Sequence, residues 1–192
     1  MAPSSSQDPF FEGLSYQDFL PLAWRPMPTT LTAAESVRLN RDNETVLRVA
    51  AALDDFRPDT SDESGVGSEL GHLDFKLNVL LDLVGHLVTR DQPLPAQTPI
   101  RLSARGLEWT ASELPAAAAP VVVSLHLQPS YPRPLELPAR VVFVATAPDG
   151  GRRVQVLFEG LSEAVADGLE RLIFRNHRRQ IAQSRSAPRA DD

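Results

Sequence analysis

Residues 100–109 read Ile-Arg-Leu-Ser-Ala-Arg-Gly-Leu-Glu-Trp, and this stretch carries the strongest signal for the fold. It joins two short β runs, at 99–104 and 107–110, through a Ser-x-x-Gly turn. Glycine and serine favour turns because glycine tolerates unusual backbone angles and the serine hydroxyl bonds to nearby backbone groups. The stretch therefore predicts two strands joined by a tight turn.

The sequence after residue 110 continues the strand pattern. Apolar and polar side chains alternate over 121–127 and 154–158, and a long run at 139–145 places Val141 and Phe143 on one face. Residues 148–151, Pro-Asp-Gly-Gly, are a strong hairpin signal. Five or six short strands without an intervening helix predict an antiparallel barrel or sandwich. A helix over 162–183 follows, with Ser162 as its cap and an apolar face of Leu161, Val165, Leu169, Leu172 and Ile173.

A heptad pattern precedes the strands, in a helix predicted over 68–89. Apolar side chains recur there at alternating steps of three and four, which is the spacing of the core positions of a coiled coil. These residues, the heptad seam, are Leu70, Leu73, Leu77, Leu80, Val84 and Leu87. The seam needs a partner, which is either a helix over 30–56 folded back through the linker at 57–67 or the same helix in other copies of the chain. Leu81 and Leu83 widen the apolar face, which favours a bundle of helices from several subunits.

The N-terminal third combines a helix with an aromatic segment. Thr30 or Thr32 is a suitable cap for the helix over 30–56. Residues 1–28 are rich in proline and serine, yet they carry Phe10, Phe11, Tyr16, Phe19 and Trp24. So much apolar surface predicts that this segment docks, either on its own domain or, less favoured, on a partner protein.

Composition excludes several classes of protein. The chain has 192 residues, no cysteine and a net charge of −6. The absence of cysteine excludes disulfides and thiolate metal sites, and it favours a cytoplasmic location. No apolar run approaches the roughly 18 residues of a membrane span, and the N-terminus does not resemble a signal peptide. Residues 1–90 carry 14 acidic and 7 basic side chains, which argues against nucleic-acid binding.

No catalytic constellation is present in the sequence. The four histidines fit no HExxH pattern, and no glycine-rich phosphate loop occurs, so we expect neither an enzyme nor a bound metal or cofactor. The basic cluster at 175–179 falls near the end of the predicted C-terminal helix, where cations offset the exposed carbonyl charge. Contact with an anionic ligand or nucleic acid is the alternative for this cluster.

The order of elements resembles a PilZ domain. The quoted Ser-x-x-Gly turn, the aromatic-bearing strand after it, three long strands and a closing amphipathic helix match that domain over 99–182. The heptad helix and the opening Leu20-Pro21-Leu22-Ala23-Trp24 are similar to the N-terminal extension of the atypical, helix-bearing, tetramer-forming PilZ subfamily. The resemblance thus covers most of the chain.

The resemblance implies binding of cyclic di-GMP through an RxxxR arm and a D/N-x-S-x-x-G motif. Ser103 and Gly106 match the second motif, but Arg101 replaces its acidic or amide residue and cannot accept a hydrogen bond from guanine. Arg90 is followed at the fourth position by Leu94, so the arginine pair is missing. The alternative is an atypical cyclic di-GMP site formed by Arg101, Ser103, Arg105 and Gly106.

The sequence therefore predicts an α+β protein in four parts. These are an aromatic-containing extension (1–28), a helical oligomerisation module (29–90), a PilZ-like antiparallel β-barrel with a C-terminal helix (91–183) and a disordered tail (184–192). Its predicted function is a non-enzymatic adaptor in bacterial motility or virulence signalling. It would form a homo-oligomer, most simply a tetramer, and bind an unidentified signalling protein, without nucleic acid or membrane insertion.

Overall fold

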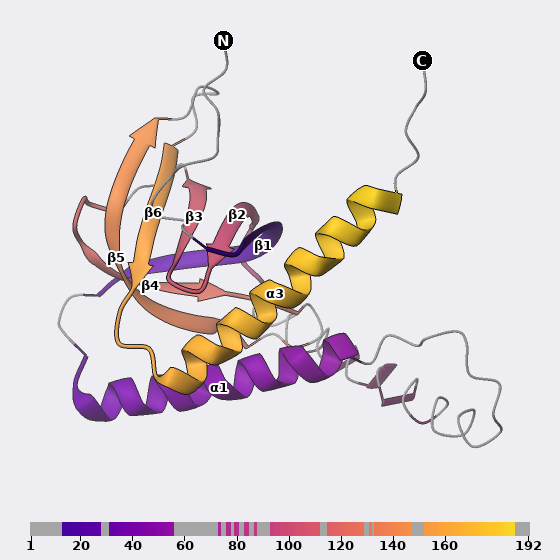
Figure 1. The fold of residues 1–192 in the computed structure, drawn as a ribbon. Coiled ribbons are helices and arrows are strands. Elements are labelled where there is room, and N and C mark those ends of the chain that lie inside the picture. The colour runs from indigo at the N-terminus through magenta and orange to yellow at the C-terminus, as the bar shows by residue number, and fades with distance from the viewer. Residues whose placement is uncertain are drawn as a thin grey trace, which may run out of the picture.

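The computed structural model describes residues 13–27, 31–55, 73, 76–77, 79–80, 83–84, 87, 93–111, 115–128, 131, 133–146 and 152–186. Six antiparallel strands close a barrel in the order β1-β2-β3-β6-β5-β4. A long helix, α3, runs along one side of the barrel and crosses α1, which lies beneath it (Figure 1). The elements are β1 (Ser15–Pro26), α1 (Ala33–Asp55), β2 (Gln97–Ser103), β3 (Gly106–Ala111), β4 (Pro120–Leu125), β5 (Leu135–Thr146), β6 (Arg152–Phe158) and α3 (Glu163–Ser186). The predicted fold class, an antiparallel barrel with a closing helix, is confirmed.

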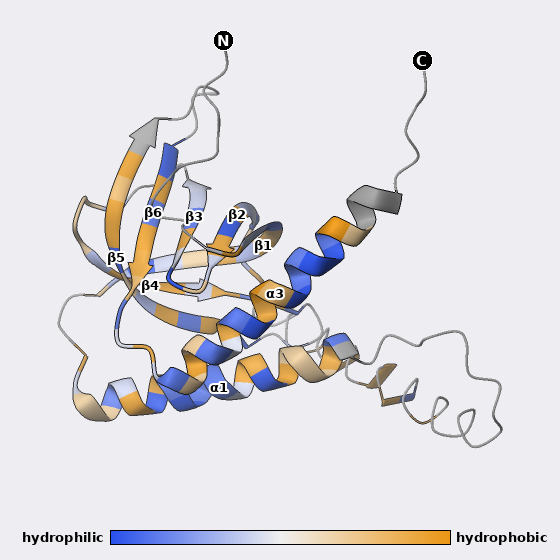
Figure 2. Cartoon of the chain, in the orientation of Figure 1, coloured by the Kyte–Doolittle hydropathy of each residue, from blue (hydrophilic) through white to orange (hydrophobic). Residues whose placement is uncertain are grey.

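The barrel interior is built from the alternating apolar residues of the strands. Figure 2 shows this alternation as orange and blue bands along the strands. Trp109 is the largest fully buried side chain. Other barrel residues in the same core cluster include Ile100, Leu102, Leu107, Val121, Val123, Leu125, Leu135, Leu137, Ala139, Val141, Val154 and Val156.

Strand β1 corrects the predicted domain boundaries, which placed 1–28 outside a barrel beginning at 91. Its first half pairs with β2, from Ser15↔Ser103 to Pro21↔Gln97. Its second half pairs with β4, from Leu22↔Leu125 onward. Proline lacks a backbone N–H, but Pro21 lies where β1 changes partner, and its carbonyl accepts a bond from the His126 N–H at 3.0 Å. β1 therefore closes the barrel despite the proline in its middle.

The favoured expectation that the aromatic segment docks on its own domain is confirmed for β1. Tyr16 and Leu22 are buried in the main core. Trp24 packs against that core from its edge, whereas Phe19 is exposed. Phe10 and Phe11 lie outside the described residues.

A bulge in β5 corrects a second expectation. The register against β6 shifts between Val141 and Phe143. One inserted residue reverses which face the following side chains occupy. Val141 is therefore only 2% exposed, whereas Phe143 is 47% exposed on the outside of the barrel.

Helix α1 begins at a reciprocal capping box. The Glu35 N–H donates to Thr32 Oγ1, and the Thr32 N–H donates to Glu35 Oε2 at 2.8 Å. These bonds to the ionised carboxylate lower the pKa of Glu35. Of the two predicted caps, Thr32 is thus confirmed, and Thr30 lies outside the described residues.

The buried face of α1 packs on the barrel and on α3. Val46 and Leu47 belong to the barrel core cluster, and Ala50 is also buried. A Cβ added at Gly168 of α3 would lie 2.9 Å from Leu47 Cδ1, so glycine permits the close approach of the two helices. The hairpin alternative, in which α1 covers the heptad seam, is therefore wrong for the described residues.

Helix α3 follows the sequence prediction closely. Ser162 Oγ accepts a bond from the Val165 N–H at 3.3 Å, which confirms the predicted cap. Val165, Leu169, Leu172 and Ile173 are buried as expected. The helix continues to Ser186, beyond the predicted end at 183, and the remainder of the predicted tail lies outside the described residues. No helix in the described part of the chain combines the length and apolarity needed to cross a membrane.

Candidate functional site

The Ser-x-x-Gly turn between β2 and β3 is held together by Ser103. Its hydroxyl donates to the Gly106 carbonyl at 3.1 Å and accepts from the Gly106 N–H at 3.1 Å. It also accepts from the Arg105 N–H at 3.4 Å, and the side chain is buried. The Ser103 hydroxyl therefore uses its bonding capacity within the turn.

The four residues of the alternative ligand site do not converge on one cavity. Ser103 and Arg105 line a pocket that faces α3. Arg101 instead lines a hollow over β1, β2 and β3, where its Nε donates to Ser15 Oγ at 3.2 Å. Gly106 is buried at the end of the turn.

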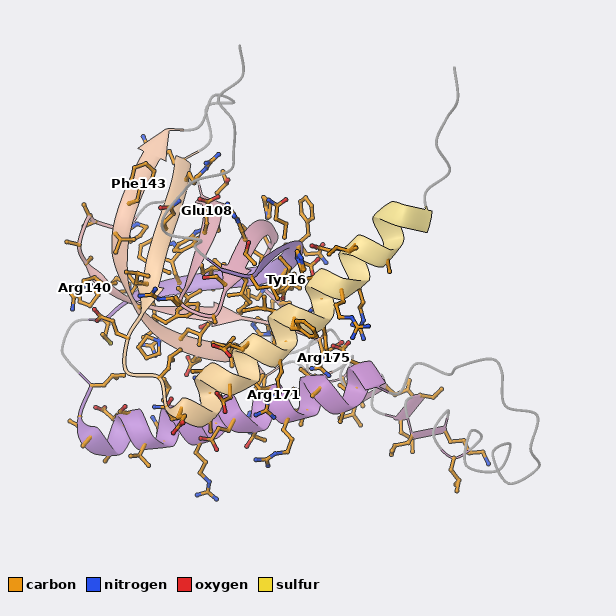
Figure 3. The ribbon with its side chains drawn as sticks, in the orientation of Figure 1. Tyr16, Glu108, Arg140, Phe143, Arg171 and Arg175 are labelled. Carbon is orange, nitrogen blue, oxygen red and sulfur yellow. The ribbon has the colours of Figure 1, made fainter. Side chains whose placement is uncertain are left out.

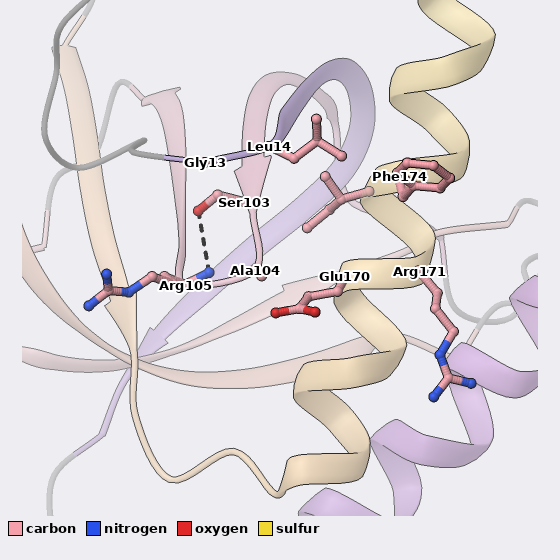
Figure 4. A pocket seen from close by; sticks show the side chains of 9 residues that line it. Gly13, Leu14, Ser103, Ala104, Arg105, Glu170, Arg171 and Phe174 are labelled. Atoms are coloured by element: carbon pink, nitrogen blue, oxygen red, sulfur yellow. Dashed lines mark hydrogen bonds between the residues drawn. The ribbon is translucent and has the colours of Figure 1, made fainter.

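The pocket beside the turn has a volume of about 470 Å³. Its walls come from the start of β1, the turn and α3, and most of its lining is apolar. Figure 4 shows Leu14 and Phe174 at its mouth and Glu170 projecting toward it, while Arg105 and Arg171 point away from it in different directions. Sequence reasoning missed Leu14 and Phe174 because they are single apolar residues outside the strong periodic patterns.

The hollow around Arg101 has a more polar lining. Glu108 lies 3.7 Å from Arg153 and accepts a bond from Gln155 Nε2 at 2.6 Å. Arg101 stands opposite Glu108 in the β2–β3 register. The charged side chains of this surface thus lie among groups of opposite sign.

Two residues of the basic cluster on α3, Arg179 and His177, contact neighbouring elements, a use that neither sequence alternative anticipated. Arg179 lies 3.2 Å from the carboxylate of Asp54 at the end of α1. His177 Nδ1 lies 3.2 Å from the Ser15 carbonyl, and Arg178 stacks over Phe174 at 5.7 Å from the ring centre. Figure 3 shows Arg171 and Arg175 on the side of α3 toward α1. The partners of Arg179 and His177 come from distant parts of the chain, so their spacing in the sequence held no signal for these two contacts.

Tyr16 is the most strongly perturbed titratable group of the described structure. Burial raises the pKa of its phenol well above the ordinary value, and the carboxylates of Asp18 and Asp54 raise the pKa further. Tyr16 also lines a small polar cavity with both of these acids. No group of three or more metal-ligating side chains occurs among the residues described.

The heptad seam is an apolar surface that no described residue covers. The described positions between 73 and 87 are helical. The seam residues Leu73, Leu77, Leu80, Val84 and Leu87 are 54–66% exposed, and Val79 and Leu83 beside them are also exposed. Leu70 lies outside the described residues. Figure 1 shows this segment beyond the end of α1, away from the barrel.

A scan against protein-family models matches residues 47–186 to the atypical PilZ domain, described as a cyclic di-GMP receptor. The chain belongs to the atypical PilZ domain family. This confirms the resemblance seen in the sequence. The matched range begins within α1 and includes the heptad seam, but it leaves out β1.

One solved structure gives the same assignment. A pathogenic protein from Xanthomonas campestris, described as a tetrameric PilZ domain self-assembled through an unusual helical bundle, has a TM-score of 0.72 and 27% identity. The match covers 89% of this PilZ protein and 92% of that chain. The inhibitor of motility from Bacillus subtilis matches at a TM-score of 0.36 and 18% identity, over 45% of this chain and 43% of that chain. A search of curated proteins finds no match.

Proposed function

We propose that this PilZ protein is a non-enzymatic regulatory adaptor that self-assembles through the heptad seam. The observation that carries the proposal is the exposure of five seam residues on one helical segment. Soluble proteins rarely leave large contiguous apolar patches open to water unless the patch binds something. Because the spacing of the seam is that of a coiled coil, its natural partner is an identical seam.

The similar Xanthomonas protein supports a tetramer. That protein is described as tetrameric and assembled through a helical bundle, and its similarity extends over 89% of the present chain. Bundles of four helices bury a wider apolar face than a two-stranded coil does. Leu83, which lies beside the seam and is exposed, gives the helix that extra width. The assembly would act in the cytoplasm and present several barrels to an unidentified protein of a motility or virulence pathway.

The state of the ligand motif supports an adaptor rather than a conventional receptor. Arg101 replaces the acidic or amide residue of the motif, and a guanidinium has no acceptor for a guanine edge. The Ser103 hydroxyl is engaged by Gly106. We therefore expect the domain not to bind cyclic di-GMP through the usual motifs, nor to use any cofactor or metal.

The double variant Leu77→Glu plus Val84→Glu tests self-assembly. It places two charges one heptad apart in the seam, and we expect light scattering to give a monomer for it and a tetramer for the unchanged protein at tens of micromolar. The control is Asn78→Glu plus Gly85→Glu, which adds the same charges at the next positions, outside the seam, and should keep the assembly. A monomeric unchanged protein, or a double variant that still assembles, would refute the proposal.

The second candidate function is a cyclic di-GMP receptor with an atypical site. It is favoured by the family's description as a receptor and by exposed Arg105 at a pocket of about 470 Å³. Calorimetric titration separates the candidates, with no heat of binding expected for the adaptor. Binding at micromolar or lower concentration that is lost in Arg101→Ala or Arg105→Ala would establish the receptor instead.

A further inference from the structure

The pocket beside the Ser103–Gly106 turn leaves apolar surface open at its mouth. Phe174 is 53% exposed there and Leu14 is 40% exposed. The deeper wall includes Ile173, which is buried, and Ala104. A pocket of about 470 Å³ is large enough for an aromatic side chain. The described residues thus form a binding surface with nothing described inside it.

The chain itself leads into this pocket. Gly13 and Leu14, the first described residues, are part of its wall (Figure 4). The four residues before them are Pro9-Phe10-Phe11-Glu12. Phe11 is two residues from Gly13, and two residues of chain span at most about 7 Å, so a phenylalanine side chain at position 11 can reach the pocket. Gly13 has φ +131, in the region that glycine adopts readily, and this angle permits a sharp change of direction at the edge of the pocket.

The chemistry of the preceding segment also suits the pocket. Its phenylalanines match the apolar lining, and aromatic pairs gain energy beyond the area that they bury. The Arg105 and Arg171 side chains point away from the pocket (Figure 4), so the match rests on apolar character and not on charge. The aromatic side chains of the segment are therefore what suits the pocket.

We propose that the pocket is the docking site of the chain's own Pro9–Glu12 segment, with a phenylalanine side chain seated between Leu14 and Phe174. Connection through Gly13 makes the contact intramolecular, and the docked segment lies beside the turn that carries Arg105. The proposal is independent of self-assembly, because none of these residues belongs to the heptad seam.

The absence of cysteine from the chain allows a clean test. Ala104→Cys introduces a single thiol into the pocket wall, and its rate of reaction with a thiol reagent reports whether the pocket is covered. We expect the further change Phe10→Ala plus Phe11→Ala to raise this rate about tenfold, which corresponds to about 1.4 kcal/mol of docking free energy. The control Ser4→Ala plus Ser5→Ala changes two residues before the Pro9–Glu12 segment without removing an aromatic ring, and it should leave the rate unchanged.

Two further measurements separate uncovering of the pocket from a general change in thiol reactivity and from loss of folding. Val37→Cys places a thiol on an exposed part of α1, where the phenylalanine substitutions should not change the rate. Melting curves establish that each variant is folded. Equal rates at position 104 with and without the phenylalanines would overturn the proposal. So would protection that grows with protein concentration, because the segment would then come from another copy.

Discussion

Helix α1 and the heptad-seam segment carry similar apolar periodicity, yet the apolar face of one is buried and that of the other is exposed. The apolar face of α1 is covered by the barrel and α3, whereas the described seam residues are 54–66% exposed. The difference lies in the polar residues. α1 places Asn40 and Asn43 among its buried positions, and the seam has no polar member.

The two asparagines explain what α1 binds. At Glu136, β5 pairs with β4 on one side, and its pairing with β6 begins only at Ala139. Asn43 occupies the free side: its Nδ2 donates to the Glu136 carbonyl at 2.7 Å, and its Oδ1 accepts from the Glu136 N–H at 2.9 Å. Asn40 does the same for the loop before α3, with bonds to the Gly160 carbonyl and the Ser162 N–H. A helix that must satisfy open backbone needs such groups, and one that packs on another apolar seam does not.

Truncating one leucine in each helix should give the largest contrast. Leu47→Ala removes a buried side chain, so we expect a loss of about 3 kcal/mol in the free energy of unfolding at every protein concentration. Leu80→Ala removes a side chain that the single chain leaves exposed. Its cost should therefore grow with protein concentration, because it acts through assembly. Urea denaturation at several protein concentrations checks both expectations. A loss of stability for Leu80→Ala that does not depend on protein concentration would contradict the contrast between the two helices.

Removing the amide of Asn43 should have the next largest effect. Asn43→Ala leaves the Glu136 N–H and carbonyl without their partner beneath α1, and we expect a loss of about 2 kcal/mol. Asn78→Ala, the matched change beside the seam, should alter stability by less than about 0.5 kcal/mol. Chemical denaturation measures both. Equal losses of stability in Asn43→Ala and Asn78→Ala would show that the hydrogen bonds of Asn43 do not explain why α1 is covered and the seam is not.

A pH titration of stability tests whether β1 belongs to the covered region. The pKa of Tyr16 is raised in the folded protein, whereas an unfolded tyrosine titrates near 10.0. Above that pH the unfolded chain releases a proton that the folded chain retains, so stability should fall by up to about 1.4 kcal/mol per pH unit. Tyr16→Phe should lack this component between pH 9 and 11. The Leu80→Ala variant should keep it, and identical pH profiles for Tyr16→Phe and the unchanged protein would contradict the assignment.

The sequence predicted the barrel well where strands follow one another closely. Five of the six strands, the Ser103–Gly106 turn and the buried face of α3 follow from local alternation and turn chemistry. β1 was missed because Pro21 interrupts its pattern, and only the change of partner from β2 to β4 makes that proline acceptable. The bulge that turns Phe143 outward likewise depends on pairing with β6.

The candidate site was predicted only in part. Ser103 and Gly106 were recognised from their spacing, and the structure shows the bonds that they make. The separation of Arg101 from Arg105 was not predictable, because Arg101 lies within β2 whereas Arg105 lies in the turn, where the chain has already left the strand. The pocket was invisible to sequence reasoning since its walls come from residues 13–14, 103–105 and 170–174.

By itself, the sequence determined the elements whose causes are local. Alternating apolar residues predict the strands, apolar residues at helical spacing predict the helices, and the family motif can be identified from its residues. Tertiary structure alone decided which apolar faces are covered, that β1 closes the barrel and where a pocket forms. The physical reason is that burial and backbone pairing are properties of contacts between distant segments. A periodic apolar face indicates that the helix needs a packing partner. Only the folded structure shows whether that partner comes from the same chain.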